Sequence, residues 1–380
     1  MTMQSAGRLT RFQTLLQTQE ISLALVGDPF NVCYLTGYWT ILSGLPGTEQ
    51  WLAVRARGDP WLAVPGLEEA LAREQCPDLL DIRYLRPGET LVRGGRRPAQ
   101  TVPQLVRGAL DALPAGAVVG VDASPLRTDR YRRLEENLRG GEVVDLGPHL
   151  AAMRASKDPQ EVQSIRDAAV ITANAAAAIF HALRPKITEN DLAAEAVRVI
   201  WAHGGTISHL VVASGPRGAL PHALPTARAV EPGDFVVVDI GVFRDNYWAE
   251  IARTFVMGTP TRDQARLLEL VQRAQTAARN VLRAGIPARD VDEAARAVLR
   301  DAGFDDGTYI HSTGHGLGVM GPDAPVIAPH NAAPVPMNAT LTLEPGLYFP
   351  GSGGIRIEDS FLVSATGVEC LTEEYHALVS

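Results

Sequence analysis

The sequence predicts two domains: an α/β domain over residues 1–150, and an α+β domain over residues 151–380 in which helices flank a strand-rich sheet. In the first part, apolar strand-like runs alternate with helical stretches, which is typical of an α/β domain. The sequence pattern changes at Asp145–Pro159, where Gly147-Pro148 interrupts the chain and an alanine-rich amphipathic stretch follows. A chain of 380 residues is also long enough for two or three domains.

The expected elements of the first domain are short and alternate in type. Arg8–Thr18 has helical spacing, and Ile21–Val26 is predicted to be a buried strand that ends at Gly27-Asp28-Pro29. Further strands are expected at Gln50–Arg55, Trp61–Pro65, Ile82–Leu85 and Val118–Val121, and further helices at Leu67–Gln75, Val102–Leu113 and Pro125–Leu138. The Gly-, Arg- and Pro-rich segment Arg86–Pro98 is expected to be a solvated loop.

The second domain is expected to contain four long helices. Asp158-Pro159 is a typical helix start, because proline is tolerated in the first turn. Thr188 is followed three residues later by Asp191, which approximates a capping box. The expected helices are Gln160–Leu183, Thr188–His203, Arg262–Arg283 and Val291–Ala302.

Between these helices, Phe235–Phe255 is predicted to form a tight hairpin, because two β-branched and aromatic runs enclose a polar turn. With a loop centred on Arg244 and Asp245, Asp239 would face Glu250 directly, and like charges placed there repel each other. A cation between the two carboxylates would remove the repulsion. The alternative is an exposed hairpin with both acids in water.

Composition excludes several classes of function. The net charge is −8 and there is no long basic run, so neither nucleic acid nor an anionic membrane is an expected partner. Cys33, Cys76 and Cys370 lie far apart without CxxC spacing, which indicates neither a disulfide framework nor a thiolate metal site. No signal peptide or membrane-spanning apolar run is present. A cytoplasmic protein is therefore expected.

Three further segments carry polar groups in unusual positions: His311–Gly318, Thr342–Gly346 and Gly354–Asp359. In the last of these, strand alternation places Arg356 and Glu358 on one face. Charged side chains on an otherwise buried strand require partners, so we expect these segments to meet in one site.

Five residues of the hairpin and these segments form a candidate metal centre: Asp239, Glu250, His315, Glu344 and Glu358. With a neutral imidazole, the four carboxylates carry a charge of −4, which two divalent cations would balance. Oxygen-rich ligation with one histidine suits Mn²⁺ and tolerates Zn²⁺, Co²⁺ or Fe²⁺, and two metals about 3.5–4 Å apart can activate water for attack on a carbonyl. Taken singly, each residue also fits an exposed acid, a core histidine or a strand-edge glutamate.

The ordered motifs resemble the pita-bread metallopeptidase family, which includes Xaa-Pro dipeptidases, aminopeptidases P and methionine aminopeptidases. The matching motifs are Asp-x₁₀-acid followed by Arg-Thr-Phe, then GHGLG, LEPGLY and GIRIED. Val211–Pro225 resembles the family's segment with a catalytic histidine, which falls on His222. Tyr34-Leu35-Thr36-Gly37 is similar to the N-terminal domain of the creatinase and prolidase branch, a domain that methionine aminopeptidases lack. The resemblance covers nearly the whole chain.

The resemblance implies a role for each donor. Asp239 would chelate one metal ion, His315 and Glu344 would bind the other, and Glu250 and Glu358 would bridge them. The implied activity is metal-dependent hydrolysis of the bond between an N-terminal residue and proline, in a dipeptide or a longer peptide. Both substrate lengths stay open.

Catalytic roles are implied as well. Glu344 would act as general base, His222 would steady the tetrahedral intermediate or the scissile amide, and Arg356 would orient the bridging carboxylates. Tyr348 is expected to be a pocket wall. Relatives dimerise through the N-terminal domain, so a homodimer is expected, with Tyr38-Trp39 near the neighbour's site.

Three positions depart from the family pattern. Glu250 stands where aspartate is usual, Ala252 replaces a threonine, and Pro322 occupies the place of a second active-site histidine. Loss of one preorganised donor can cost about 10²–10³ in rate. Two alternatives therefore stay open: a creatinase-like, metal-independent C–N hydrolase that uses His222, and a weakly active pita-bread binding protein. An acid or histidine at all five metal positions favours the metalloenzyme.

Overall fold

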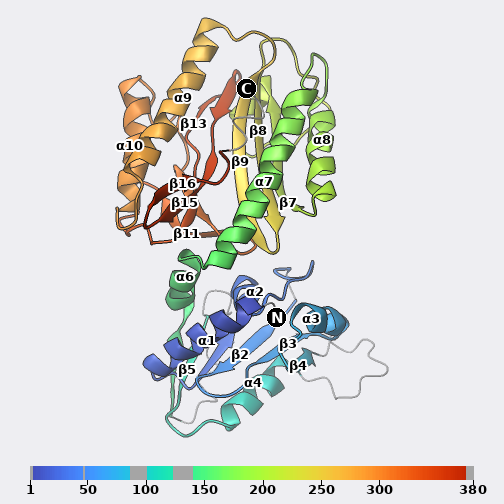
Figure 1. The fold of residues 1–380 in the computed structure, drawn as a ribbon, viewed down its shortest axis with the longest axis vertical. Coiled ribbons are helices and arrows are strands. Elements are labelled where there is room, and N and C mark those ends of the chain that lie inside the picture. Colours follow the sequence, from blue (N-terminus) through green and yellow to red (C-terminus); the bar gives the residue numbers. More distant parts are fainter. Residues whose placement is uncertain (1–2, 46–47, 86–100, 123–139, 374–380) are drawn as a thin grey trace. The chain divides into compact units, whose positions relative to one another are not determined.

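The computed structural model describes residues 3–45, 48–85, 101–122 and 140–373, and the chain divides into two compact units, Met1–Ala152 and Met153–Ser380 (Figure 1). The expected helix Pro125–Leu138 and loop Arg86–Pro98 lie outside the described residues. None of the helices in the described ranges is long and apolar enough to cross a membrane.

The first unit is a six-stranded mixed sheet in the order β4-β3-β2-β1-β5-β6 with helices packed against it, which confirms the α/β class. β1 pairs antiparallel with β2 and parallel with β5. The strands are β1 (Leu23–Val26), β2 (Trp51–Arg55), β3 (Trp61–Pro65), β4 (Asp81–Leu85), β5 (Val118–Val121) and β6 (Glu142–Asp145). The helices are α1 (Met3–Thr18), α2 (Pro29–Thr36), α3 (Glu69–Gln75) and α4 (Val102–Asp111), with the 3₁₀ turn η1 (Gly66–Glu68).

The second unit contains two sheets, each beside a pair of helices, and a two-stranded hairpin. The order is β7-β8-β9 in one sheet and β11-β10-β12-β15-β16 in the other, while β13 pairs with β14. The helices are α7 (Pro159–Ala182), α8 (Glu189–Ala202), α9 (Arg262–Val281) and α10 (Ala288–Asp301), and α6 (Gly147–Ala155) precedes them. The strands are β7 (Thr206–Ser214), β8 (Phe235–Arg244), β9 (Tyr247–Val256), β10 (Gly314–Leu317), β11 (Pro322–Ile327), β12 (Thr340–Leu343), β13 (Gly346–Phe349), β14 (Gly353–Arg356), β15 (Asp359–Ser364) and β16 (Gly367–Cys370).

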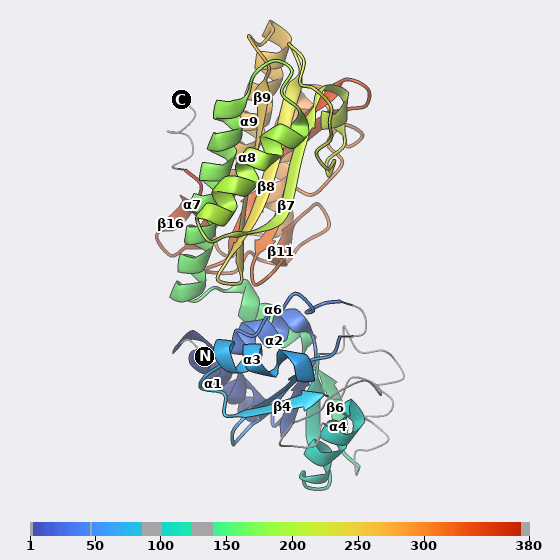
Figure 2. The ribbon, with the colours of Figure 1, turned by 90° about the vertical axis from the view of Figure 1, so that its right-hand side faces the viewer.

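Two apolar cores hold the second unit together. α7 and α8 lie side by side over β7–β9, and α9 and α10 cover strands of the other sheet (Figures 1 and 2). On β8 the residues Val236, Val238, Ile240 and Val242 belong to the core beneath α7 and α8. Because side chains alternate along a strand, Asp239 and Gly241 face the opposite way. β8 and β9 also contact β14, and β15 contacts β9, so this face meets the second sheet.

The hairpin of β8 and β9 is confirmed, but its expected register is wrong. The loop residues are Asp245 and Asn246, both with positive φ, which gives the two-residue turn favoured between twisted strands. Asp239 therefore pairs with Ala252, and Glu250 pairs with Gly241. Since side chains repeat every two residues, this shift keeps both acids on one face and makes them diagonal neighbours.

Helix caps agree with the sequence more closely than helix ends do. The capping box of Thr188 and Asp191 is confirmed, and Asp158 caps α7 with Glu161 in the same way. The sequence missed α2, which starts where only a strand end was expected: the Asp28 side chain accepts a hydrogen bond from Asn31 N. This eight-residue helix is almost wholly buried, so it shows no amphipathic spacing.

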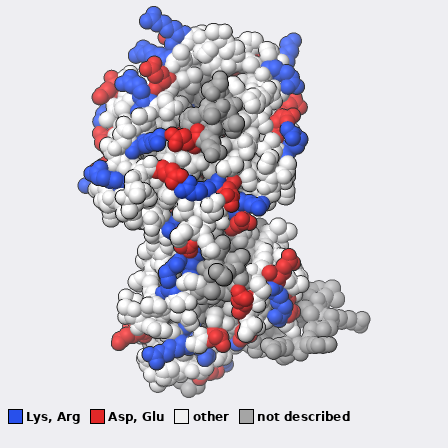
Figure 3. Space-filling model, in the orientation of Figure 1, with Lys and Arg blue, Asp and Glu red and all other residues white. Residues whose placement is uncertain are grey.

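Charged side chains of both signs are interspersed over the face shown in Figure 3. Among the described residues visible there, no broad area carries a single sign. This face therefore offers no strong electrostatic attraction for a highly charged partner.

Candidate active site

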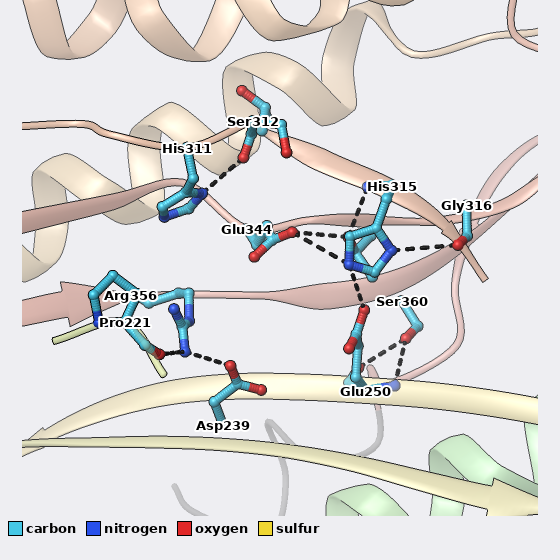
Figure 4. Close-up of polar contacts among 12 residues, drawn as sticks. Pro221, Asp239, Glu250, His311, Ser312, His315, Gly316, Glu344, Arg356 and Ser360 are labelled. Atoms are coloured by element: carbon cyan, nitrogen blue, oxygen red, sulfur yellow. Dashed lines mark hydrogen bonds and ion pairs between the residues drawn. The ribbon is translucent and has the colours of Figure 1, made fainter. Parts of the chain in front are cut away.

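Polar side chains from both sheets converge where β8 and β9 meet the second sheet (Figure 4). Asp239 and Glu250 project from β8 and β9, opposite His315 and Glu344, while Arg356 reaches Asp239 from β14. His315 Nε2 lies 3.2 Å from Glu250 Oε1 and 3.6 Å from Glu344 Oε1.

Glu358 lies in the short link between β14 and β15, where backbone contacts fix it. Its amide donates to Ala252 O at 2.9 Å, and its own carbonyl accepts from Ala252 N and from the Arg253 guanidinium. Arg253 also pairs with Asp359 at 2.6 Å. The next residue, Thr254, exchanges hydrogen bonds with the backbone of Arg356 at 3.0 and 3.1 Å. The Arg-Thr-Phe motif thus anchors the segment that carries Glu358 and Arg356.

Asp239 is held in its charged form. Burial alone would raise its pKa, but the neighbouring Arg356 guanidinium, helped by His209 and His222, lowers that pKa well below its ordinary value. Arg356 is itself 2% exposed and also donates to Tyr348 Oη and Pro221 O, each at 3.0 Å.

Glu250 and Glu358 are in the opposite situation. Burial raises the pKa of both carboxyls well above the usual range, and repulsion from the neighbouring carboxylates adds to the effect. Glu250 Oε1 and Glu358 Oε2 are buried without a hydrogen-bond partner. The His315 imidazole lies near Glu250 Oε1, at 3.2 Å. Buried polar atoms normally accept or donate hydrogen bonds, so two carboxylate oxygens that accept none, among four converging acids, fit divalent cations as their partners.

The chemistry of the donor set fits, but its spacing is not that of a formed site. Among the described residues, no group of three or more His, Cys, Asp or Glu side chains stands ready to hold a metal ion. Both Asp239 oxygens are already engaged, one by Arg356 and one by His209 Nε2 at 2.8 Å. Metal binding would therefore require these side chains to rearrange.

Metal-stripped protein is expected to lose stability as the pH rises above about 4.3, the ordinary pKa of a glutamate, because Glu250 and Glu358 hold their protons more tightly when folded than when unfolded. A carboxyl with a raised folded pKa stabilises the fold fully below its unfolded pKa, and that contribution disappears as the pH rises through the folded value. Denaturant unfolding of stripped protein across this pH range checks the expectation.

The variant Glu250→Gln isolates this site in the pH experiment, because it removes one titrating group and should flatten the pH dependence. Burial also raises the pKa of Asp122 in the first unit to about 7, but that contribution is common to both proteins. Identical pH profiles for the variant and the unaltered protein would contradict the assignment to Glu250.

His222 lies in the turn after the 3₁₀ helix η2 (Gly215–Ala219), and its side chain is exposed. The two ends of the His222 loop, Ser214 and Thr226, are tied to Glu189 at the start of α8. The buried Glu189 carboxylate accepts from the amide and hydroxyl of Ser214, both at 2.8 Å, and from those of Thr226, at 3.0 and 2.7 Å. Glu189 thus fixes both ends of the loop that carries the exposed His222 close to Asp239.

Tyr348 is not the pocket wall that the sequence suggested. It is 3% exposed, accepts from Arg356 Nη1, and its hydroxyl lies 2.8 Å from His311 Nε2. His311 also lines a recess of about 430 Å³, together with Ile310, Val326 and His330. Since none of the five metal-ligand candidates lines this recess, we treat it as separate from the site.

Besides Glu250, the two other departures from the family pattern lie in different surroundings. Ala252 is fully buried, and its backbone pairs with Asp239 on one side and with Glu358 on the other. Pro322 is exposed at the start of β11, and the following Asp323 is a buried partner of Lys157 at 3.1 Å. The structure therefore offers no imidazole at position 322.

The sequence missed His209. Its Nε2 lies 2.8 Å from Asp239 Oδ1 and 3.8 Å from Glu250 Oε2. No spacing motif marks this histidine. The available signal was Gly241, because a glycine inside a β-branched strand indicates that another group approaches the backbone closely.

Comparisons with known proteins cover nearly the whole chain. The model of metallopeptidase family M24 matches residues 163–365, and that of the Creatinase/Prolidase N-terminal domain matches residues 8–156. An Xaa-Pro dipeptidase of Pyrococcus furiosus is 32% identical over 98% of this chain and 99% of its own length. A probable dipeptidase PepE of Mycobacterium tuberculosis is also 32% identical, over 92% of this chain and 89% of the relative. The crystal structure of dipeptidase PepE from Mycobacterium ulcerans superposes with a TM-score of 0.81 at 29% identity, covering 97% and 96% of the two chains.

Proposed function

The chain belongs to metallopeptidase family M24, with a Creatinase/Prolidase N-terminal domain, and from this premise we propose that it hydrolyses the bond between an N-terminal residue and proline with two divalent metal ions. It is a peptidase with the pita-bread fold. The observation that carries the proposal is the convergence of four carboxylates and an imidazole, in which two buried carboxylate oxygens accept no hydrogen bond. Residues 151–380 would form the catalytic domain and residues 1–150 the creatinase-like domain.

The proposed ligands divide between the two sheets. Asp239 would hold one metal ion, His315 and Glu344 the other, and Glu250 and Glu358 would bridge them. When bound, the two cations would supply Lewis-acid charge for the attacking water and the scissile carbonyl. Their positive charge would also remove the repulsion that raises the pKa of Glu250 and Glu358.

Side chains of the protein would then transfer the protons and stabilise the developing charge. Glu344 is the proposed general base: it takes a proton from the attacking water and later returns it to the proline nitrogen as the peptide bond breaks. His222 donates a hydrogen bond to the oxyanion or to the scissile amide. Arg356 holds Asp239 ionised and, through Pro221 O, fixes the backbone beside His222.

The finer properties concern the metal, the substrate and the assembly. An oxygen-rich donor set favours Mn²⁺, with Zn²⁺, Co²⁺ or Fe²⁺ as substitutes. Several relatives are Xaa-Pro dipeptidases, which favours a dipeptide over a longer peptide as the substrate. We further propose a cytoplasmic homodimer. Tyr38 is fully buried in the first unit, so the expected contact of Tyr38-Trp39 with a neighbour's site would fall to Trp39 alone.

Proline release from Ala-Pro tests the function. Chelator-stripped protein is expected to be inactive, and added Mn²⁺ is expected to restore release, because the buried carboxylates need their cations. Ala-Pro-Ala, assayed in parallel, distinguishes dipeptidase from aminopeptidase. Equal release with and without metal would contradict the metalloenzyme and favour the creatinase-like reading. No release from either substrate in either state would favour a binding protein.

His222→Ala is expected to lower kcat for proline release at least about tenfold, since it removes a donor to the developing charge. Because His222 is exposed and bound to no core group, the fold should be unchanged. Steady-state kinetics at saturating metal check this, with the exposed His181→Ala as the matched control. Near-normal turnover of His222→Ala would show that the catalytic histidine has been misplaced.

A further inference from the structure

His209 lies between the two acids of the β8–β9 hairpin without belonging to the proposed ligand set. Its side chain is 33% exposed, and its Nε2 is the atom that faces both carboxylates, at 2.8 Å from Asp239 Oδ1 and 3.8 Å from Glu250 Oε2. Glu250 therefore has an imidazole on each side: His209 faces its Oε2, and His315 faces its Oε1 at 3.2 Å.

The backbone makes a specific place for this ring. The β7–β8 register shifts between Ile207 and His209, so that His209 pairs with Gly241 on the face that carries Asp239. Bulges of this kind re-aim side chains next to active sites. A Cβ built on Gly241 would lie 2.4 Å from His209 Cε1 and 2.5 Å from its Nδ1. Only glycine at position 241 leaves room for the imidazole.

Trp248 contacts both imidazoles. Its ring meets His209 edge-on at 5.8 Å and stacks on His315 at 5.4 Å with an interplanar angle of 20°. The two histidines come from different sheets, yet they share one indole and one carboxylate. Because the two histidines share these two neighbours, we expect them to have the same role in the site.

We propose that His209 is a sixth donor of the metal centre and binds, through Nε2, the metal ion that Asp239 holds. The proposal rests on the metal centre of the proposed function. Each metal ion would then have one imidazole: His209 with Asp239 on one side, and His315 with Glu344 on the other, with Glu250 and Glu358 between them. An added imidazole raises the preference of the Asp239 position for Co²⁺ and Zn²⁺ over Mn²⁺.

Metal titration of the stripped full-length chain tests the proposal without using activity. Bound Co²⁺ is counted by elemental analysis and followed by visible absorption in the unaltered protein, in His209→Ala and in the exposed control His203→Ala. We expect two Co²⁺ ions in the unaltered protein and the control. In His209→Ala, we expect one of them to bind at least about tenfold more weakly, with an altered spectrum. Mn²⁺ affinity should fall less than Co²⁺ affinity.

Two further measurements separate a ligand from a hydrogen-bonding residue. Free imidazole should restore the Co²⁺ spectrum of His209→Ala, because it can fill the space left above Gly241. His209→Gln keeps an amide donor for Asp239 but replaces the imidazole nitrogen by an amide oxygen, a poorer Co²⁺ ligand, so it should also weaken Co²⁺ binding and alter the spectrum. Its unfolding curve, recorded without metal, shows whether the fold is retained.

Failure of the His209 proposal and failure of the proposed metal centre give different results. Full Co²⁺ affinity and an unchanged spectrum in His209→Ala, or in His209→Gln, would overturn the proposed ligand and leave the metal centre standing. If the unaltered protein binds no Co²⁺, the proposed centre fails and His209 fails with it.

Discussion

Replacement of Glu344 by glutamine is expected to lower kcat for proline release by about 10²–10⁴-fold, the usual contribution of a general base. Of the four carboxylates, Glu344 is the one that water reaches most easily: its side chain is 14% exposed, against 9% for Asp239 and 3% for Glu250. Glutamine keeps the shape of the side chain but accepts no proton. Steady-state kinetics at saturating Mn²⁺ measure the effect.

Bound metal is measured on the same Glu344→Gln samples, so that loss of a ligand and loss of a base are told apart. Glu293→Gln is the matched control, because Glu293 lies on α10 in an exposed pair with Arg300 at 2.6 Å. Turnover within tenfold of the unaltered enzyme, at full metal content, would remove Glu344 from the role of base.

The second large effect is expected from Arg356→Met in metal-stripped protein. Arg356 is nearly fully buried, and its loss leaves the Asp239 carboxylate buried without its main positive partner. Breaking a buried pair in this way costs about 3–5 kcal/mol. Since the chain has two units, hydrogen exchange of the β8 and β9 amides in increasing denaturant is the measurement that reports on this unit.

The double variant Arg356→Met with Asp239→Asn is the control for the stability effect. It removes both charges, so most of the lost stability should return, even though metal binding is lost. If the double variant is no more stable than Arg356→Met, the cost comes from lost packing and from the contacts with Tyr348 and Pro221, and the ion pair is not its source.

The convergence of the polar side chains in the candidate site could be predicted because they are marked in the sequence by residue type, order and strand alternation, whereas their role as metal ligands stays a prediction. Asp239, Glu250, His315 and Glu344 converge as expected, and Arg356 reaches Asp239. Alternation along Gly354–Asp359 placed Arg356 and Glu358 on one face without knowledge of any tertiary contact.

The pairing register could not be predicted, because it depends on which two residues of Arg244-Asp245-Asn246 adopt positive φ. Both Asp245 and Asn246 tolerate that conformation, and the twist of the strands favours a two-residue loop. The sequence contains the residues of both candidate loops, Arg244-Asp245 and Asp245-Asn246, but does not show which of the two forms.

The position of His209 in the site could not be predicted for a related reason. A bulge is a property of two paired strands, and the shift beside His209 exists only because β7 pairs with β8. In the run TISHLVVAS polar and apolar residues do not alternate regularly, and His209 is one polar residue among several. Only the pairing with Gly241 brings its ring to Asp239.

Glu189 has a consequence for how this enzyme can change over evolution. Since one buried carboxylate fastens both Ser214 and Thr226, the ends of the His222 loop are fixed from the start of α8. Substitutions at exposed positions of this loop, such as Leu220 and Leu224, can therefore accumulate without disturbing the strands that carry the acids. Selection for new peptide substrates can act on these exposed positions, while the contacts that hold the loop are inherited unchanged.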